Sequence, residues 1–216
     1  MVGNEQARIG RRTALLLGAG VSLLGRSGRA EASPGQALSA MPAWEEFSAE
    51  DGRTVGAPRR APGTVVIVEL MDYACPACKA AHAAMPGVLR ARPRMRLVRR
   101  DMPILGQASL TAAAAVAAAA LQGREEALHD ALMRLREPLR ESSIVPAAVR
   151  AGIDSVRMSR DMGGREVAAR MDGIMRIAKA VGMQGTPTYA AARGARLSGF
   201  GYSEIIAFVD GQGANG

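Results

Sequence analysis

The pattern of apolar and polar residues predicts one α/β domain that begins with a central strand. The first uninterrupted apolar run of this domain, Thr64–Met71, is rich in β-branched residues and lies between Gly63 and the sequence "DYACP". A strand that is apolar on both faces belongs in the middle of a sheet covered on both sides. A helix is predicted to follow from Pro76, because proline is well tolerated in the first helical turn.

Two prolines and an arginine-rich segment come next. We expect Pro86 to kink or break the first helix and Pro93 to end it. Arg94–Asp101 alternates apolar residues with arginines, which predicts a second strand with a less regular burial pattern. Residues at helical spacing, with a polar break at Glu141–Ser143, then predict a block of helices over Ser109–Gln122, Arg124–Arg136, Pro146–Gly152 and Arg165–Val181.

The chain returns to strand character near its C-terminus. Thr188–Ala192 and Ala195–Ser198 have the composition of two strands joined by a turn at Arg193-Gly194, and an amphipathic helix is predicted at Ser203–Asp210. The order strand, helix, strand, helical block, strand, strand, helix predicts an α/β fold. Its architecture is a three-layer α/β/α sandwich with an inserted helical domain.

The N-terminal residues 1–32 have the features of an export signal. A segment with three arginines precedes the apolar run Thr13–Gly25, which is too short to span a bilayer because spanning takes about 20 residues. Ala30 and Ala32 form a small-x-small cleavage site. The pair Arg11-Arg12 also resembles a twin-arginine signal. These features predict export to the periplasm.

The predicted domain organisation follows from these patterns. Residues 1–32 are the signal peptide, and residues 33–61 are a linker and N-terminal edge segment with an edge strand near Arg53–Val55. Residues 62–212 form the domain, with the helical insertion at about 105–182.

Charge and composition exclude one class of partner. The chain has 28 Lys and Arg against 20 Asp and Glu, a net charge of +8 that falls to about +5 without the signal. All of the positive residues except Lys79 and Lys179 are arginines, which we interpret as scattered surface charge. With three Phe, three Tyr and one Trp, the chain lacks the basic and aromatic surface that stacks on nucleic acid.

The only two cysteines, Cys75 and Cys78, lie in the sequence "DYACPACKAAH". A structural zinc site needs four ligands, and only two histidines and scattered carboxylates remain to complete one. A structural disulfide would close a two-residue loop and stabilise little. We therefore expect a redox-active pair that needs no metal and no cofactor. The helix N-terminus stabilises a thiolate on Cys75, and Cys78 lies one turn further on, where it can resolve a mixed disulfide.

Four segments in order resemble the thiol:disulfide interchange proteins of the DsbA type. They are "VVIVELMDYACPACKAAH", "RLVRRDMPILGQASLTAAAA", "LHDALM" and "VGMQGTPTY", and the resemblance extends from about Gly56 to Asp210. It implies a thioredoxin fold with a helical domain inserted before Pro187. It also implies that Pro187 is cis and faces Cys75, so that the backbone of Thr186 can pair with a substrate peptide. From the local sequence alone, a trans proline that starts a strand is an equal alternative.

Glu69 is the third candidate for catalysis. A carboxylate in a central strand is costly unless it is paired or protonated. Members of the DsbA-type family that this chain resembles often carry an acidic residue at this position. We expect it to exchange a proton with Cys78. The alternative is an ion pair with an arginine or with Lys79. His82, one turn beyond Cys78, is expected to serve packing, with tuning of the thiolates as the alternative, and His129 is expected to be structural.

The residues between the cysteines, Pro76 and Ala77, bear on the direction of the reaction. The strongest oxidases of the DsbA-type family carry a histidine where this chain has Ala77. Because alanine supplies no charge to stabilise the Cys75 thiolate, we expect this chain to be a milder oxidant. We predict a monomeric oxidase of exported cysteine-containing proteins that a quinone-linked membrane partner reoxidises. The alternatives are a reductase or isomerase kept reduced by a membrane thiol donor, and a redox-silent binding or chaperone module.

Overall fold

The computed structural model describes residues 44–45, 48–49, 53–180, 185–192, 196–198 and 201–213. Its centre is a mixed five-stranded sheet in the order β1-β3-β2-β4-β5. The strands are β1 (Thr54–Gly56), β2 (Val65–Met71), β3 (Met95–Asp101), β4 (Thr188–Ala191) and β5 (Arg196–Ser198). Only the β2–β3 pair is parallel. This is the thioredoxin-type α/β fold that the sequence predicts.

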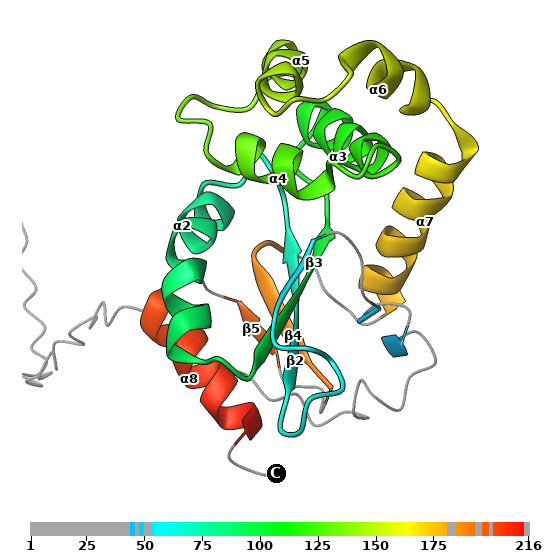
Figure 1. Ribbon diagram of the computed structural model, residues 1–216. Helices are drawn as coiled ribbons and strands as arrows, with labels where there is room; N and C mark the ends of the chain where they lie inside the picture. The colour runs from blue at the N-terminus through cyan, green and yellow to red at the C-terminus, as the bar shows by residue number, and fades with distance from the viewer. Residues whose placement is uncertain are drawn as a thin grey trace, which may run out of the picture.

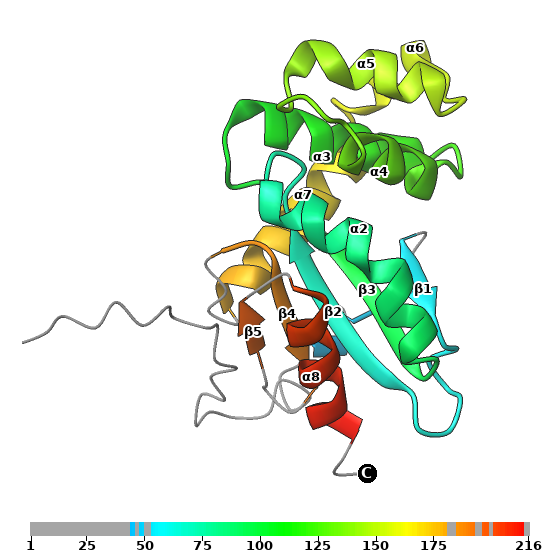
Figure 2. The same ribbon diagram turned by 90° about the vertical axis from the view of Figure 1, so that its left-hand side faces the viewer.

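Helices cover both faces of the sheet and one end of it (Figures 1 and 2). One face is covered by α2 (Pro76–Ala91) and α8 (Tyr202–Gly213), and the other by α7 (Arg165–Ala180). The remaining helices form the block at the end of the sheet: α3 (Gln107–Ala120), α4 (Glu125–Met133), α5 (Glu141–Arg150) and α6 (Ser155–Asp161). Among the described residues, no helix is both long and apolar enough to cross a bilayer.

The alternation of side chains along β2 divides the core between the two faces. Ile67 packs with residues of α2 and α8, whereas Val68 and Leu70 pack with Trp44 and with Ala178 of α7. A third apolar cluster fills the helical block and continues to Cys75 and Cys78. The cysteines therefore lie where the sheet domain meets the inserted helices.

The structure corrects the predicted helix boundaries in three places. Helix α2 continues through Pro86 as one element, because the neighbouring Met85 and Val88 are buried and their packing compensates for one lost hydrogen bond. The expected polar break at Glu141–Ser143 is the first turn of α5, where the Ser143 hydroxyl bonds the backbone of Arg140. Helix α6 was not predicted. It is capped by Asp154, which accepts a hydrogen bond from the Arg157 N–H at 2.9 Å.

The interpretation of the arginines as surface charge is wrong for several of them. Arg53 is fully buried and pairs with Asp101 of β3 and with Glu125 of α4, with its Nε 2.8 Å from Glu125 Oε1. Glu125 also pairs with Arg170 of α7. These ion pairs connect the segment before β1, the end of β3 and two inserted helices. All seven residues of β3 are buried, which the alternating pattern did not indicate.

We expect Arg53→Met to destabilise the fold by about 3–5 kcal/mol, because it removes the buried arginine partner of Asp101 and leaves Glu125 with Arg170 alone. Urea unfolding with an unchanged m-value measures the loss. Arg59→Met is the control, since Arg59 pairs with the largely exposed Glu45 and its loss should be much smaller. Equal losses in the two variants would show that the buried network does not hold these elements together.

Candidate active site

The two cysteines lie at the junction of β2 and α2. Cys75 is the N-cap of α2, and its Sγ accepts a hydrogen bond from the Cys78 N–H at 3.3 Å. The same Sγ donates to the Thr186 carbonyl oxygen at 3.4 Å. Cys75 retains 6% exposure, whereas Cys78 is fully buried. Cys75 is therefore the sulfur that a substrate can reach, and Cys78 lies behind it.

The Thr186–Pro187 segment lies against Cys75 from the far end of the chain. The peptide bond between the two residues is cis, which confirms the expectation drawn from the family resemblance over the trans alternative. Pro187 leads directly into β4, the neighbour of β2, and this strand pairing brings residues 111 positions apart into contact. Pro76 is exposed at the start of α2, and Ala77 is half-buried against the apolar cluster of the helical block.

The surroundings of Cys78 favour its neutral form. Burial raises the pKa of the Cys78 thiol well above its ordinary value. A sulfur in this position is released from a disulfide as a thiol, which requires a proton from a nearby acid.

Glu69 lies in the middle of a row of side chains that crosses three strands. Its direct cross-strand neighbours are Arg99 on β3 and Tyr189 on β4. The Tyr189 hydroxyl donates to Glu69 Oε1 at 2.9 Å, and Arg99 Nε lies 3.8 Å from Oε2. Burial raises the pKa of Glu69, and Arg99 and Tyr189 only partly offset that effect. Glu69 thus has both features considered from the sequence, a raised pKa and an arginine partner.

Lys79 is not the partner of Glu69. Its ammonium donates to the carbonyl oxygen of Leu135 at 2.9 Å, which ties α2 to the segment after α4. The part of the ion-pair alternative that involved Lys79 is therefore wrong.

Tyr189 is a site residue that the sequence analysis missed. It is fully buried, and burial raises the pKa of its hydroxyl, with further contributions from the charges of Glu69 and Cys78. Its hydroxyl therefore lies within electrostatic reach of both the carboxylate and the inner thiol. The available signal was its position two residues after Pro187. In the structure it lies opposite Glu69 of β2, on the same face of the sheet.

Asp72 is a second missed residue, and it organises the loops around the cysteines. Its carboxylate is buried and accepts hydrogen bonds from four groups, at distances of 2.6–3.0 Å: the N–H groups of Ala74, Ile104 and Leu105 and the Ser109 hydroxyl. Its backbone carbonyl accepts from the Cys75 N–H at 3.1 Å. An aspartate four residues before Pro76, the predicted helix start, was the available signal.

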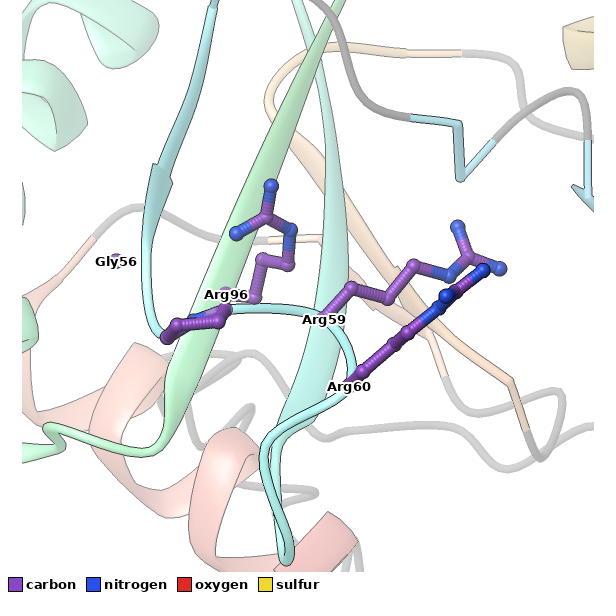
Figure 3. Close-up of a pocket in the computed structure, with 5 residues that line it drawn as sticks. Gly56, Arg59, Arg60 and Arg96 are labelled. Carbon is purple, nitrogen blue, oxygen red and sulfur yellow. The ribbon is translucent and has the colours of Figure 1, made fainter.

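A large arginine-lined pocket lies away from this site. It has a volume of about 610 Å³ and is lined by Gly56, Pro58, Arg59, Arg60 and Arg96. Arg59 and Arg60 extend in the same direction while Arg96 rises separately from β3 (Figure 3). Arg59 donates to the Ser48 carbonyl and to Glu45, and Arg96 donates to the Ala57 carbonyl. These arginines fasten the N-terminal segment to the sheet edge.

Comparison with known proteins agrees with this geometry. The sequence model of the DSBA-like thioredoxin domain matches residues 66–210. A thioredoxin-like oxidoreductase from Silicibacter pomeroyi DSS-3 is 36% identical, with a TM-score of 0.69 over 77% of this chain and 95% of that one. A periplasmic thioredoxin-like protein from Salmonella enterica serovar Typhimurium shares the fold, at 22% identity and a TM-score of 0.61, over 80% of this chain and 96% of that one.

Two curated relatives are much longer proteins, and this chain matches only a part of each. The Na(+)/H(+) antiporter NhaA 3 of Salinispora tropica is 32% identical over 137 residues, which are 62% of this chain and 21% of the antiporter. The chain therefore spans about a fifth of the length of the curated relatives that it matches.

We expect Glu69→Gln to slow thiol–disulfide exchange by about tenfold or more and to change its pH dependence, because glutamine cannot transfer a proton. The folded pKa of Glu69 is raised above its ordinary value of 4.5, so the wild type loses stability as the pH rises from 4.5 toward the folded pKa. The variant should lack this loss and be at least as stable at neutral pH. Stopped-flow kinetics and urea unfolding across pH measure the two effects.

Tyr189→Phe is the matched control for the Glu69 variant. It keeps the ring and the carboxylate but removes the hydrogen bond to Oε1, so a smaller kinetic effect is expected. Unchanged kinetics together with a large stability loss in Glu69→Gln would leave Glu69 with a structural role only.

Proposed function

The chain belongs to the DSBA-like thioredoxin domain family of thiol–disulfide oxidoreductases, and we propose that it acts there as a periplasmic oxidase that introduces disulfide bonds into exported proteins. The observation that carries the proposed direction is the position of Cys75 as the N-cap of α2. Its sulfur accepts the Cys78 N–H at the positive end of the helix, and both effects stabilise a thiolate. Stabilising the reduced form makes the disulfide more oxidising.

The proposed first step transfers one disulfide bond. A substrate thiolate attacks Cys75 Sγ, the Cys75–Cys78 bond breaks, and the electron pair of that bond goes to the Cys78 sulfur. This sulfur takes up the proton of Glu69, whose raised pKa lets it carry one and whose Oε1 is held by Tyr189. The products are a mixed disulfide between substrate and Cys75, a Cys78 thiol and a Glu69 carboxylate.

The proposed second step releases the oxidised substrate. A second substrate thiolate attacks the substrate sulfur of the mixed disulfide, and Cys75 leaves as a thiolate held by the Cys78 N–H. The two electrons gained by the cysteine pair then pass to a quinone-linked membrane oxidase, which restores the disulfide. The protein works in this cycle as a monomer.

Substrate recognition is assigned to backbone and apolar surface beside Cys75. Thr186 lies two residues before the first residue of β4, and its backbone can pair with an extended peptide. Ile104 and Leu105 are 38% and 50% exposed, on the loop that Asp72 ties to the start of α2. Exposed apolar residues of this kind suit unfolded exported chains, whose apolar side chains are not yet buried.

Export by the signal at residues 1–32 places this chemistry in an oxidising compartment. The Salmonella enterica protein of the same fold is described as periplasmic, which supports the assignment.

The direction is tested by the redox state of the cysteine pair in the periplasm. Rapid acid quenching followed by alkylation of free thiols should find Cys75 and Cys78 mostly as a disulfide. We also expect Cys78→Ser to accumulate mixed disulfides with exported proteins, because no resolving thiol remains to break them, whereas Cys75→Ser should not. Mass spectrometry of the trapped complexes identifies the bonded cysteine.

Two results would change the proposal. A pair found mostly reduced would favour the reductase or isomerase role, with a membrane thiol donor as the partner. Absence of dithiol oxidase activity in the wild type, with no complexes trapped by Cys78→Ser, would leave a redox-silent binding module.

The residue between Pro76 and Cys78 should set the strength of the oxidant. We expect Ala77→His to raise the reduction potential, because a histidine in the first turn of α2 can donate a hydrogen bond or positive charge to the Cys75 thiolate. Each ~1.4 kcal/mol of thiolate stabilisation raises the potential by about 30 mV. Equilibration with glutathione measures the potential, and thiolate absorbance against pH measures the cause.

Ala77→Gln controls for size, since Ala77 packs against the helical block and a larger side chain alone can disturb it. An unchanged potential in Ala77→His would mean that Thr186 and the helix dipole alone set the redox poise.

A further inference from the structure

Two histidines and an aspartate converge where α2, the helix that begins at the cysteines, packs against α4. One nitrogen of His82, one of His129 and one carboxylate oxygen of Asp130 all lie within 4.8 Å of one another. His82 Nε2 is 3.3 Å from Asp130 Oδ1, and the two imidazole rings meet edge to face with centroids 5.2 Å apart. The sequence analysis expected no metal-binding role for either histidine.

His129 is fully buried, and its Nε2 finds no hydrogen-bond partner within the described part of the chain. Its other nitrogen, Nδ1, lies 3.2 Å from the Tyr73 hydroxyl. That hydroxyl is also hydrogen-bonded to the Asp101 carboxylate, which can only accept, and to Arg53, which can only donate, so the Tyr73 proton points to Asp101. The Tyr73 oxygen then accepts the Nδ1–H of His129, and Nε2 keeps a free lone pair. A buried polar atom without a partner is costly, which calls for an explanation.

Histidine binds metals in its neutral form, and burial favours that form for both imidazoles. Burial lowers the pKa of His129 well below its ordinary value, and the charges of Arg99 and Arg53 add to the shift. Burial also lowers the pKa of His82, together with Arg99 and against the effect of Asp130.

The spacing of the donor atoms suits a small metal ion. Ligands about 2.0–2.2 Å from a tetrahedral ion lie roughly 3.4 Å apart, close to the His82–Asp130 distance of 3.3 Å. A largest separation of 4.8 Å closes with side-chain movements on the order of 1 Å. His82 and Asp130 also line an open pocket of about 530 Å³ between α2 and α4, which leaves room for a fourth ligand.

We propose that His82, His129 and Asp130 bind a divalent transition-metal ion of the Zn²⁺ class, with one coordination position open to the pocket. Two imidazoles and one carboxylate match the donor set of open zinc sites and suit borderline ions. This site lies outside the thiol chemistry proposed above and does not depend on its direction.

The charges of neighbouring arginines oppose cation binding, and carboxylates offset part of that effect. Arg99 pairs with Glu126 at 2.7 Å and lies near Glu69, and Arg134 pairs with the second oxygen of Asp130 at 3.0 Å. The metal would join α2 to α4 one helical turn beyond Cys78, so metal binding should stabilise the contact between the redox helix and the inserted block.

The test uses the full oxidised protein without a histidine tag, because the Cys75–Cys78 disulfide then keeps the thiolates from binding metal. Calorimetric titration with Zn²⁺ should show one ion per chain, and titration with Co²⁺ should give the intense visible absorption of a four- or five-coordinate site. His82→Asn and Asp130→Asn should each weaken Zn²⁺ binding at least tenfold. Zn²⁺ should raise the melting temperature of the wild type and not that of His82→Asn.

Glu126→Gln is the matched control, since Glu126 lines the same pocket but does not belong to the three donors. Because Glu126 also pairs with Arg99, its variant should weaken Zn²⁺ binding slightly, and much less than His82→Asn does. His82 and Asp130 are half-buried, so their variants are expected to fold, and circular dichroism verifies this. No saturable binding, equal binding in His82→Asn and the wild type, or an equal loss in Glu126→Gln would each overturn the proposed site.

Discussion

The geometry of the redox site depends on the buried carboxylate of Asp72. It accepts hydrogen bonds from the Ala74 N–H in the loop between β2 and α2, from two backbone N–H groups after β3 and from a hydroxyl on α3. These segments come from both the sheet domain and the inserted helices, so one side chain fixes the seam where the cysteines lie. The same residue's carbonyl holds the Cys75 N–H, which orients the cap whose sulfur faces Thr186. A buried carboxyl group is tolerated here because its oxygens are satisfied by donors within hydrogen-bond distance.

Glu69 and Tyr189 lie on the face of the sheet that α2 covers, and Cys75, at the start of α2, keeps 6% exposure. Glu69, Tyr189 and Cys78 lie on the inner side, where burial raises the pKa of each group. In such surroundings neither the acid nor the thiol gains from ionising alone, which is the property that the proposed proton exchange between Glu69 and Cys78 needs. The outer sulfur, Cys75, has a helix N-terminus to stabilise its charge instead. The two cysteines thus occupy different environments, which gives them different roles in exchange.

The sequence carried most of the fold and part of the site, for physical reasons that differ between elements. Strand β2 and helix α2 were predictable because a β-branched run and an N-terminal proline act locally. The burial of β3 was not predictable, since Arg99 is internal where a carboxylate of the inserted helices pairs with it. The burial of Arg53 before β1 likewise depends on carboxylates from distant segments. The roles of Tyr189 and Asp72 likewise depend on strand register and loop contacts across long stretches of sequence. Cys75 and Cys78 stood out because the chain contains no other cysteine.

The choice of arginine over lysine also has a structural reason inside the fold. Arg53 reaches two carboxylates from one buried guanidinium, and Arg99 bonds Glu126 while lying beside Glu69. A planar group with five donors can serve two acidic partners in fixed directions, whereas a lysine ammonium presents a single point charge. Both arginines also act electrostatically on the histidine pair and on Glu69, where they oppose protonation. The buried arginines therefore hold the inserted helices on the sheet and at the same time set the charge states of the groups beneath the cysteines.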